Sequence, residues 1–330
     1  MIKLIHWNKN DGIQKNLQLE NLKALLSSPD NVIWVDISNS PYEESLFVLR
    51  DIFGFHQLAI DDALEETHVP KIDDWGNYLY LVSQVIDLNQ QGEMLQYPTQ
   101  ELDIFIGKNY CLTYHENNSS TIEKVWNSTT KISSIYERGP GYLLYLLLDE
   151  TASDFIARTD QIGLMINNIE DKLFDNPDNA LLEDMFSLKR IILNLKQSII
   201  PQREVLNKLA RGDYPILGTR TEMYFRDIYD HFTRVYDIAI NVQDLTNNTL
   251  EIFLSTINNR MNGIMKTLTI ITTLFMPISF LVGFFGMNFF APIEQSNWWT
   301  STPILVGVIA ASALFPLIML FYFIKKGWMK

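Results

Sequence analysis

A single asparagine interrupts an apolar run near the C-terminus, and its amide is the first group that could do chemistry. The run is FLVGFFGMNFF, from Phe280 to Phe290, and the asparagine is Asn288. Burying an unpaired amide among apolar groups costs about 1–3 kcal/mol in protein mutational data. We therefore expect this amide to face water or an ion, with Gly286 allowing a backbone conformation that other residues avoid. The simpler alternative is an asparagine that caps the C-terminal end of a helix.

Acidic residues could also bind a metal, because carboxylate oxygens are the ligands that hard divalent cations prefer. Single acids on helices more commonly lie in solvent without a ligand, and the residues alone favour that interpretation for the acids of this chain.

Two charge-free runs must position the asparagine. No charged residue occurs from Thr267 to Ile293 or from Gln295 to Ile324, and Glu294 alone separates the runs. Each run can hold a helix of about 20 apolar residues, which crosses about 30 Å of hydrocarbon. We predict transmembrane helices over residues 267–285 and 303–324. The alternative is a buried helical hairpin in a soluble core.

Basic residues set the predicted orientation of the two spans. Arg260 and Lys266 precede the first span, the loop over residues 286–302 has no Lys or Arg, and a lysine-rich tail occupies residues 325–330. Positive ends stay in the cytoplasm. We therefore predict a multi-pass protein of the cell (inner) membrane with both termini cytoplasmic. The first twelve residues have no apolar stretch of the kind that a signal peptide needs.

Composition argues against several other classes. The formal net charge is −13, and Cys111 is the only cysteine. An acidic chain is a poor partner for nucleic acid, so we expect none. One cysteine cannot build a disulfide framework or a thiolate zinc site. The five histidines are scattered, and no phosphate-binding glycine loop or nucleophile motif occurs, so we do not expect an enzyme.

The first 140 residues are typical of a mixed α/β domain. NVIWVDIS (Asn31–Ser38) predicts a strand, and the next segment predicts a helix with Ser40 as N-cap and Pro41 at its first position. The other expected elements are strands within 77–88 and 101–115, a hairpin turn at GKN (107–109), and short helices within 56–66 and 120–132.

Beyond residue 140 the apolar residues recur at helical spacing. We predict a helical pair over residues 141–215, with Pro201 as a kink or junction. A stalk helix is predicted over residues 216–266 and enters the bilayer directly. A polar helix of that length is not stable alone, so it needs partners.

The C-terminal part resembles the CorA family of magnesium channels. The resemblance rests on the segment MKTLTIITTLFMPISFLVGFFGMNF, which contains the family's GMN triplet just before its last residue. A short loop, a second span and the lysine-rich tail follow this segment. Upstream, YFRDIYDH (Tyr224–His231) and PQREVL (Pro201–Leu206) are also similar to the family. The resemblance covers residues 55–330 and is strongest beyond residue 220.

The resemblance implies an α+β membrane protein that assembles as a homopentamer in the lipid bilayer. Five first spans would line a pore and five second spans would surround them. The implied parts are a cytoplasmic α/β domain (1–140), a helical pair (141–215), a stalk helix (216–266), a pore-lining span (267–285), an outer loop with GMN (286–302), a second span (303–324) and a basic cytoplasmic tail (325–330).

The resemblance also implies a filter and a gate. Gly286, Met287 and Asn288 would form an oxygen-rich ring that binds hydrated Mg²⁺ weakly. Below it, residues at helical spacing share one face, which would line the pore and include an apolar gate. This pore face comprises Glu251, Asn262, Met265, Leu268, Thr272, Met276, Ser279 and Gly283, with Met265, Leu268 and Met276 as the gate.

Thr272 departs from the small apolar residue that the family usually has in the gate. Its hydroxyl would either make the gate wetter or bond back to its own helix. Both possibilities stay open at this point.

Mg²⁺ would be a regulatory ligand as well as the substrate. In the family, acids that match Asp61, Asp62, Asp149 and Asp227 meet across subunit interfaces and bind Mg²⁺. Bound ion would hold the subunits closed, and its loss would loosen the stalks and open the gate. Nearby residues replace less acidic ones of the family pattern, which leaves the preferred ion open among Mg²⁺, Co²⁺, Ni²⁺ and Zn²⁺; they are Glu65, Glu66 and His68.

Two alternatives remain for the function. One is a zinc or other transition-metal transporter of the same superfamily, although the GMN triplet favours Mg²⁺. The other is a membrane-tethered sensor or scaffold, which predicts neither ion flux nor a pentamer.

Overall fold

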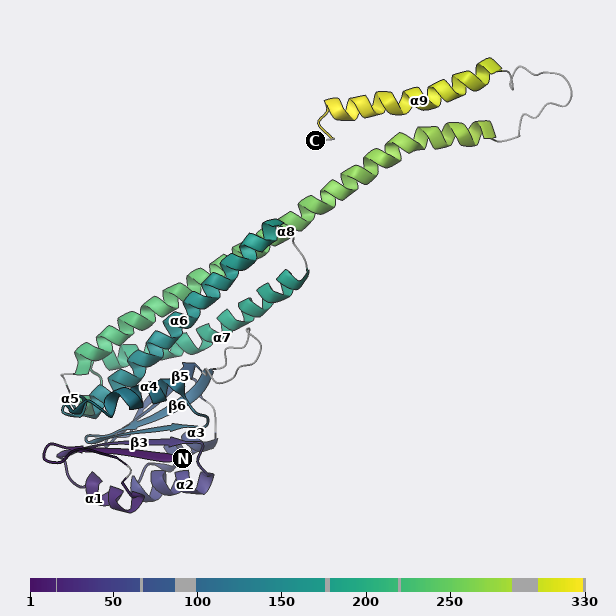
Figure 1. Cartoon of the computed structure of the whole chain (residues 1–330). Coiled ribbons are helices and arrows are strands. Elements are labelled where there is room, and N and C mark those ends of the chain that lie inside the picture. The colour runs from purple at the N-terminus through teal and green to yellow at the C-terminus, as the bar shows by residue number, and fades with distance from the viewer. Residues whose placement is uncertain are drawn as a thin grey trace. The chain divides into compact units, whose positions relative to one another are not determined.

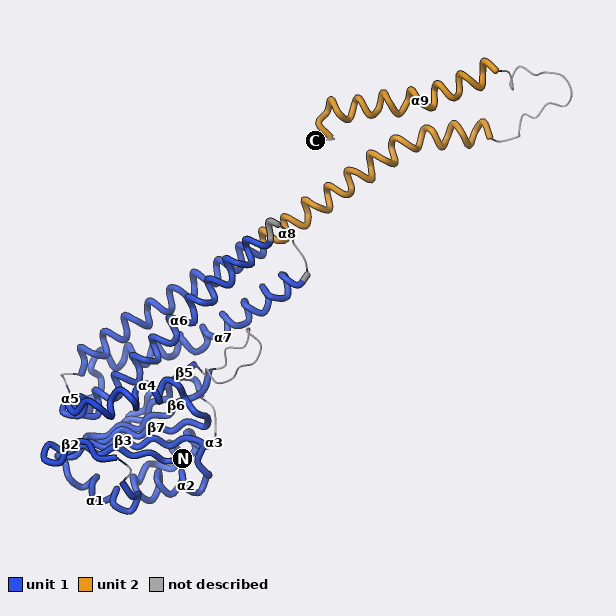
Figure 2. Tube along the Cα trace, in the orientation of Figure 1, with its two compact units in different colours: residues 1–250 blue, residues 251–330 orange. Residues whose placement is uncertain are grey.

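The computed structural model describes residues 1–15, 17–65, 68–86, 99–175, 179–218, 221–286 and 302–328. Three residues singled out by the sequence, Glu66, Met287 and Asn288, lie outside these ranges, as does the rest of the predicted outer loop from residue 289 to residue 301. The chain divides into two compact units, residues 1–250 and residues 251–330 (Figure 2).

A mixed seven-stranded sheet forms the centre of the first unit (Figure 1). The order across it is β2-β1-β3-β7-β6-β5-β4. Strands β3 and β7 are parallel, with Asp36 opposite Thr113, and the other neighbouring pairs are antiparallel. The strands are β1 (Ile2–Asn8), β2 (Gly12–Lys15), β3 (Asn31–Ser38), β4 (Lys71–Asp74), β5 (Leu79–Ile86), β6 (Thr99–Ile106) and β7 (Tyr110–His115).

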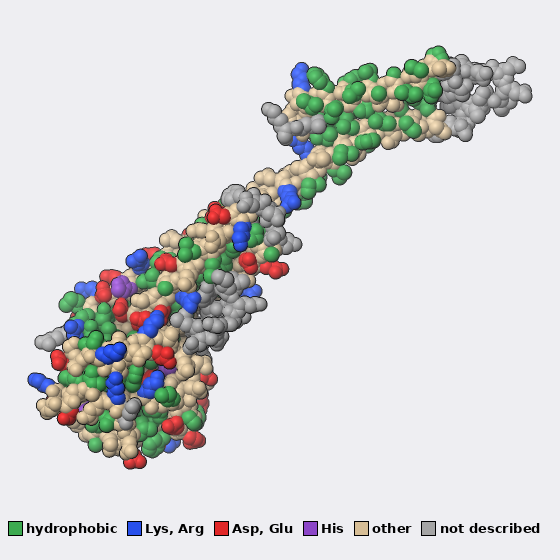
Figure 3. All heavy atoms as spheres, viewed as in Figure 1, with side chains coloured by type: hydrophobic (Ala, Val, Ile, Leu, Met, Phe, Trp, Pro, Cys, Tyr) green, Lys and Arg blue, Asp and Glu red, His purple; other side chains and the backbone are tan. Residues whose placement is uncertain are grey.

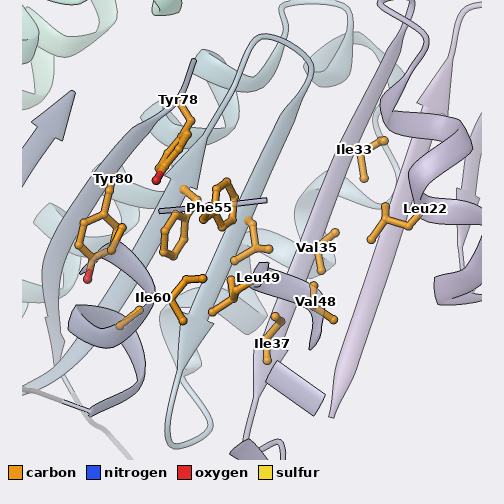
Figure 4. Close-up of a cluster of buried hydrophobic side chains, with 14 of the residues drawn as sticks. Leu22, Ile33, Val35, Ile37, Val48, Leu49, Phe55, Ile60, Tyr78 and Tyr80 are labelled. Atoms are coloured by element: carbon orange, nitrogen blue, oxygen red, sulfur yellow. The ribbon is translucent and has the colours of Figure 1, made fainter. Parts of the chain in front are cut away.

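Short helices cover one face of the sheet. In Figure 4, Val48 and Leu49 from these helices belong to one buried cluster with Ile33, Val35 and Ile37 of β3. Alternate residues of a strand point to opposite faces, so these three β3 residues build this half of the core. The elements are the 3-10 helix η1 (Leu19–Asn21), α1 (Leu22–Leu26), α2 (Tyr42–Leu46), the π-helix η2 (Phe47–Ile52) and α3 (Gln57–Glu65).

Helices that follow β7 cover the other face. Trp34 of β3 lies against Trp126 of α4, with ring centroids 4.8 Å apart. Strand β3 is therefore buried on both faces, which explains why its sequence contains the unbroken apolar run Val32–Val35 instead of alternating. These helices are α4 (Ser120–Thr129), α5 (Ser133–Tyr136), α6 (Pro140–Asp175) and α7 (Asn179–Ala210).

The predicted GKN turn is confirmed, because the Gly107 amide donates a hydrogen bond to the Tyr110 carbonyl at 3.0 Å between two antiparallel strands. Strands β1 and β2 were not predicted. The residues that pair β1 with β2 alternate between polar and apolar types on both sides of the turn that joins the two strands. Such a short alternation indicates a strand less clearly than the apolar runs of β3 and β5 do.

The start of α2 is one residue later than predicted. Pro41 is extended, with ψ 143°, so it is the N-cap and the helix begins at Tyr42. Ser40 does not cap the backbone; its hydroxyl donates to the Glu44 carboxylate at 2.7 Å. Pro201 lies inside α7, which continues to Ala210 without ending at the proline.

The second unit contains the end of one long helix and one further helix. Helix α8 runs from Glu222 to Gly286 and continues through Pro277, and α9 runs from Thr302 to Lys325. A 3-10 turn, η3 (Pro215–Leu217), occupies the expected start of the stalk, so α8 begins at Glu222 and not at residue 216. Both helices are long and apolar enough to cross a membrane.

The apolar part of each span is exposed within the chain. Only 6% of the most apolar stretch of 18 residues in α8 is buried within the chain, and 0% of the corresponding stretch in α9. On the face shown in Figure 3, hydrophobic side chains cover the described part of the second unit, whereas charged side chains gather on the first. The alternative of a hairpin buried in the chain's own soluble core is therefore wrong.

Helix α9 ends in a Schellman motif. Gly327 has a φ of 72°, its amide donates to the Ile324 carbonyl at 3.1 Å, and the Trp328 amide donates to the Phe323 carbonyl at 2.9 Å. The Trp328 and Phe323 rings stack with centroids 5.4 Å apart. This end places an exposed tryptophan beside Lys325 and Lys326, an arrangement suited to a membrane interface.

A buried polar network joins β3 to β7. Asp36 Oδ1 accepts a hydrogen bond from Thr113 Oγ1 at 2.7 Å and lies 3.1 Å from His115 Nε2. Trp34 Nε1 donates to Thr113 Oγ1 at 3.2 Å. The side chains of Asp36 and His115 are 1% and 3% exposed, so neither can exchange its partner for bulk water.

Asp36→Ala should lower the free energy of unfolding by roughly 3–5 kcal/mol, because it leaves His115 buried without its carboxylate partner. Urea unfolding of the full chain, followed by circular dichroism, measures the loss. Asp51→Ala is the control, since Asp51 pairs with Arg50 at the exposed surface and its removal should change stability little. Equal losses in the two variants would contradict a structural role for the buried network.

Candidate metal site

Helices α6 and α8 lie side by side in the first unit (Figure 1). Their shared seam is apolar, with Phe155 of α6 and Phe232 of α8 fully buried and their ring centroids 5.8 Å apart. Leu148 and Ile228 are also buried at this level of the two helices. Tight apolar packing fixes the separation of the helices, so polar residues beside the seam are held close together.

Two of the four predicted acids meet beside this seam, together with a histidine. Asp149 of α6 and Asp227 and His231 of α8 each offer one ligand atom, and these atoms all lie within 4.8 Å of one another. His231 Nδ1 is 3.3 Å from Asp149 Oδ1. We refer to these three residues as the seam triad. Two carboxylates and an imidazole are a suitable donor set for a divalent cation.

The electrostatics of the seam triad favour an added cation. Partial burial raises the pKa of Asp149, the nearby His231 opposes this shift, and the charge of Asp227 raises the pKa further. Burial and the two carboxylates also raise the pKa of Tyr145 to about 12. Negative charge is therefore unfavourable here without a counter-charge, and a divalent cation would supply one.

His231 was not among the metal ligands expected from the sequence. Its signal was the spacing in FRDIYDH, where His231 follows Asp227 by four residues and so shares its helix face. The approach of Asp149 from α6 could not be read from that spacing, because it depends on how the two helices pack.

Asp61 and Asp62 are not part of the seam triad in this chain. Both lie on α3, where Asp61 accepts a hydrogen bond from Gln57 Nε2 at 2.6 Å. Asp62 pairs with the Lys71 ammonium and lies 3.6 Å from His68 Nε2. Partial burial would lower the pKa of Lys71, but the hydrogen bond and charge of Asp62 outweigh it and raise the pKa. Asp62 therefore already has a cationic partner within the chain.

The predicted pore face lies on one uninterrupted helix. All eight of its residues fall within α8, and each is exposed in the chain. Met265, Leu268 and Met276 are 61%, 63% and 66% exposed, so nothing in the chain covers the predicted gate within the described residues. Large apolar side chains in this position need lipid or another polypeptide as a cover.

Thr272 bonds back to its own helix. Its hydroxyl donates to the Leu268 carbonyl at 2.9 Å, which is one of the two roles considered for it. Thr269 and Thr273 make the same type of bond to Met265 and Thr269 carbonyls, at 2.7 Å in each case. The hydroxyl protons of these three threonines thus have acceptors within α8 itself.

Gly286 is the last residue of α8 and is helical, so the expected special backbone conformation does not occur at this position. Apart from its chain neighbours and the adjacent backbone of α8, no described residue places a heavy atom within 4 Å of the position where a Cβ would stand. The remaining predicted filter residues, Met287 and Asn288, lie outside the described residues.

A comparison with protein families decides the relationship. The family model described as CorA-like Mg²⁺ transporter protein matches residues 29–326. The chain belongs to the CorA family. YfjQ of Bacillus subtilis is 31% identical over 330 residues, which cover 99% of this chain and 98% of YfjQ. The cobalt/magnesium transport protein CorA of Thermotoga maritima is 29% identical over 297 residues, 90% of this chain and 83% of that protein.

Solved structures agree with the CorA fold. The complete structure of the CorA magnesium transporter from Methanocaldococcus jannaschii matches with a TM-score of 0.83 and 24% identity, covering 99% of this chain and 98% of that one. The predicted CorA architecture is confirmed: an N-terminal α/β domain, a long helix and two C-terminal apolar helices. As a CorA protein the chain belongs to a family of membrane transporters of divalent cations.

Asp149→Asn should leave the cation-free CorA protein as stable as the wild type or more stable at neutral pH. The pKa of Asp149 is higher in the folded chain than in the unfolded chain, so ionisation of this carboxyl disfavours folding. The cost to the free energy of unfolding is fully present once the pH exceeds the folded-state pKa. Mg²⁺ or Co²⁺ should in turn stabilise the variant less than the wild type, because a ligand stabilises only the state that binds it.

Thermal unfolding in EDTA and in a Mg²⁺ series measures both effects. Asp230→Asn, an exposed acid on the same helix, is the control and should respond to Mg²⁺ as the wild type does. If Asp149→Asn also gains the full Mg²⁺-dependent shift, Asp149 is not a ligand.

Proposed function

We propose that this CorA protein is a homopentameric channel for Mg²⁺, and also for Co²⁺, in the cell (inner) membrane with both termini in the cytoplasm. One observation carries the proposal. The continuous helix α8 bears two members of the seam triad near its start and the whole pore face between its middle and its end, from Glu251 to Gly283. Ion binding beside the α6–α8 seam could therefore bias the same element that forms the pore.

The filter is assigned to Gly286, Met287 and Asn288. Mg²⁺ is small and dehydrates reluctantly, so a channel accepts it most readily with its waters. Five asparagine amides and the neighbouring carbonyls would receive hydrogen bonds from those polarised waters. A ring without formal charge binds the ion weakly enough to release it.

The gate is assigned to Met265, Leu268 and Met276. These three side chains are exposed in the single chain, and a fivefold arrangement would turn them toward a common axis. A narrow apolar ring blocks ions by excluding water. Glu251, exposed about three turns before Asn262, would add a ring of carboxylates that concentrates cations at the inner mouth.

Regulation is assigned to the seam triad together with Asp61 and Asp62 of a neighbouring subunit. An ion bridging these acids would stabilise the closed arrangement, and its loss would leave repelling carboxylates. Within the chain Asp62 is paired with Lys71. An intersubunit ion would therefore have to displace the Lys71 ammonium from Asp62, whereas Asp61, bonded to Gln57, is easier to recruit.

His231 favours Co²⁺ or another transition metal as a second candidate for the regulatory ion. Imidazole nitrogen suits such metals, whereas Mg²⁺ prefers oxygen donors. This observation keeps open the transport of transition metals as an alternative to Mg²⁺, and flux measurements separate the two.

Purified wild-type protein in liposomes should take up Mg²⁺, and Asn288→Ala should abolish uptake while leaving assembly intact, because the amide ring is lost. A luminal Mg²⁺ indicator measures flux, and size-exclusion chromatography with light scattering measures assembly. Asn241→Ala, an exposed asparagine of α8 in the first unit, is the matched control and should keep full uptake.

Full Mg²⁺ uptake by Asn288→Ala would remove that residue from the filter. Absence of any flux in the wild type would instead support the tethered sensor or scaffold. The same liposomes, supplied with Co²⁺, Ni²⁺ or Zn²⁺ with and without a proton gradient, rank the permeant ions.

Met276→Asp should make the channel leak at Mg²⁺ concentrations that close the wild type, since a carboxylate keeps the constriction wet. The cytoplasmic domain faces the liposome lumen, which is preloaded with enough Mg²⁺ to close the wild type. The measurement is the further uptake of Mg²⁺ from the outside. Met223→Asp, at a methionine that is 75% exposed at the start of α8, should not leak. A tight Met276→Asp channel would place the gate elsewhere.

A further inference from the structure

A compact aromatic cluster lies directly before the seam triad on the same two helices. Tyr142 and Tyr145 come from α6 and Tyr224 comes from α8. The ring centroids are 5.3 Å apart for Tyr142–Tyr145, 5.1 Å for Tyr142–Tyr224 and 5.1 Å for Tyr145–Tyr224. Each ring thus contacts the other two, and the cluster bridges the α6–α8 seam.

An arginine covers this cluster. The Arg138 guanidinium lies 4.6 Å from the centre of the Tyr142 ring, and its Nη1 donates to the Tyr224 hydroxyl at 3.4 Å. Arg138 thereby links one ring from each helix. Gly139, with a φ of 84°, makes the turn between Arg138 and the start of α6, and its amide donates to the Tyr136 carbonyl at 3.0 Å. A residue with a Cβ would be strained in that conformation.

The cluster is aligned with the seam triad on both helices. Asp149 follows Tyr145 by four residues on α6, and Asp227 follows Tyr224 by three on α8. These spacings place each acid one helical turn from a clustered ring, on the same face. The rings therefore pack α6 against α8 one turn before the two carboxylates, next to the apolar seam that also holds the helices together.

We propose that Arg138, Tyr142, Tyr145 and Tyr224 form a clamp that holds Asp149, Asp227 and His231 at the spacing needed to share one divalent cation. The clamp residues are positioning residues and do not themselves bind the ion. The inference rests on the proposed regulatory role of the seam triad and adds what sets its affinity. Without the clamp, mutual repulsion of the empty carboxylates would widen the spacing of the triad while the apolar seam keeps the helices packed, and binding would first have to restore that spacing.

The sign of the Arg138 effect distinguishes a clamp from a simple charge. A cation near a cation site repels the incoming ion, so removal of the charge alone would tighten ion binding. Removal of a clamp residue weakens binding instead, because the site is no longer held in its binding geometry. Arg138 is exposed, so its substitution tests this without disturbing the core.

Arg138→Gln should raise the Mg²⁺ midpoint for protection of the full-length protein against proteinase K, which does not depend on Arg for cleavage, by about two- to fivefold, the range set by an exposed cation–π contact. Saturating Mg²⁺ should restore full protection, and the melting temperature in EDTA should stay unchanged. Arg226→Gln is the matched control, because Arg226 is an exposed arginine of α8 next to Asp227 and outside the clamp. Its midpoint should stay the same or fall.

The tyrosines give a second test. Tyr224→Ala should raise the midpoint at least as much as Arg138→Gln, whereas Tyr224→Phe keeps the ring contacts and should stay within about twofold of the wild type. If Tyr224→Ala does not fold, the Arg138 and Tyr224→Phe variants still decide the matter.

An Arg138→Gln midpoint that is unchanged or lower than that of the wild type would overturn the clamp. Asp149→Asn, measured in parallel, separates this failure from failure of the proposed site. If Asp149→Asn raises the midpoint and Arg138→Gln does not, only the clamp is wrong. If Asp149→Asn leaves the midpoint unchanged, the seam triad does not bind the ion and both proposals fall.

Discussion

A helix of 65 residues has to be covered along its length, and much of this CorA structure follows from that constraint. In the first unit, side chains of α8 such as Phe225, Ile228 and Phe232 are buried. Beyond residue 250, Met265, Leu268 and Phe280 are largely exposed within the chain. Each Å² of apolar surface left in water costs about 25 cal/mol. Lipid and neighbouring copies of the chain are the covers that a pentameric channel would provide.

The same seam that covers the start of α8 places charges where they can respond to an ion. Apolar packing of Phe155 against Phe232 holds α6 and α8 together, while Asp149 and Asp227 oppose each other beside it. The charge of Asp227 raises the pKa of Asp149, so a cation bound between the two carboxylates would offset their repulsion. Asp62 differs, because Lys71 already neutralises it within the chain.

Local patterns predicted the elements that had strong local signals. Strands β3, β5 and β6–β7 follow from runs of aromatic and β-branched residues bounded by turn residues. Strands β1 and β2 lack bounded runs of this kind; β1 is held by its pairing with β3, and β2 pairs with β1 at the edge of the sheet. The helix after β3 began one residue late and continued as a π-helix, because neither the extended Pro41 nor the wider turn of η2 can be recognised from side-chain type alone.

The sequence by itself determined the two spans and the face of α8 that carries the predicted pore residues. Charge-free length and helical spacing are properties of consecutive residues, and they hold however the rest of the chain packs. Only the tertiary structure decided that Asp149 meets Asp227 and His231, that three tyrosines and Arg138 join the two helices there, and that Asp62 faces Lys71. These groups come from different elements, and their distances depend on how buried apolar side chains interlock between those elements, which no pattern along one segment contains.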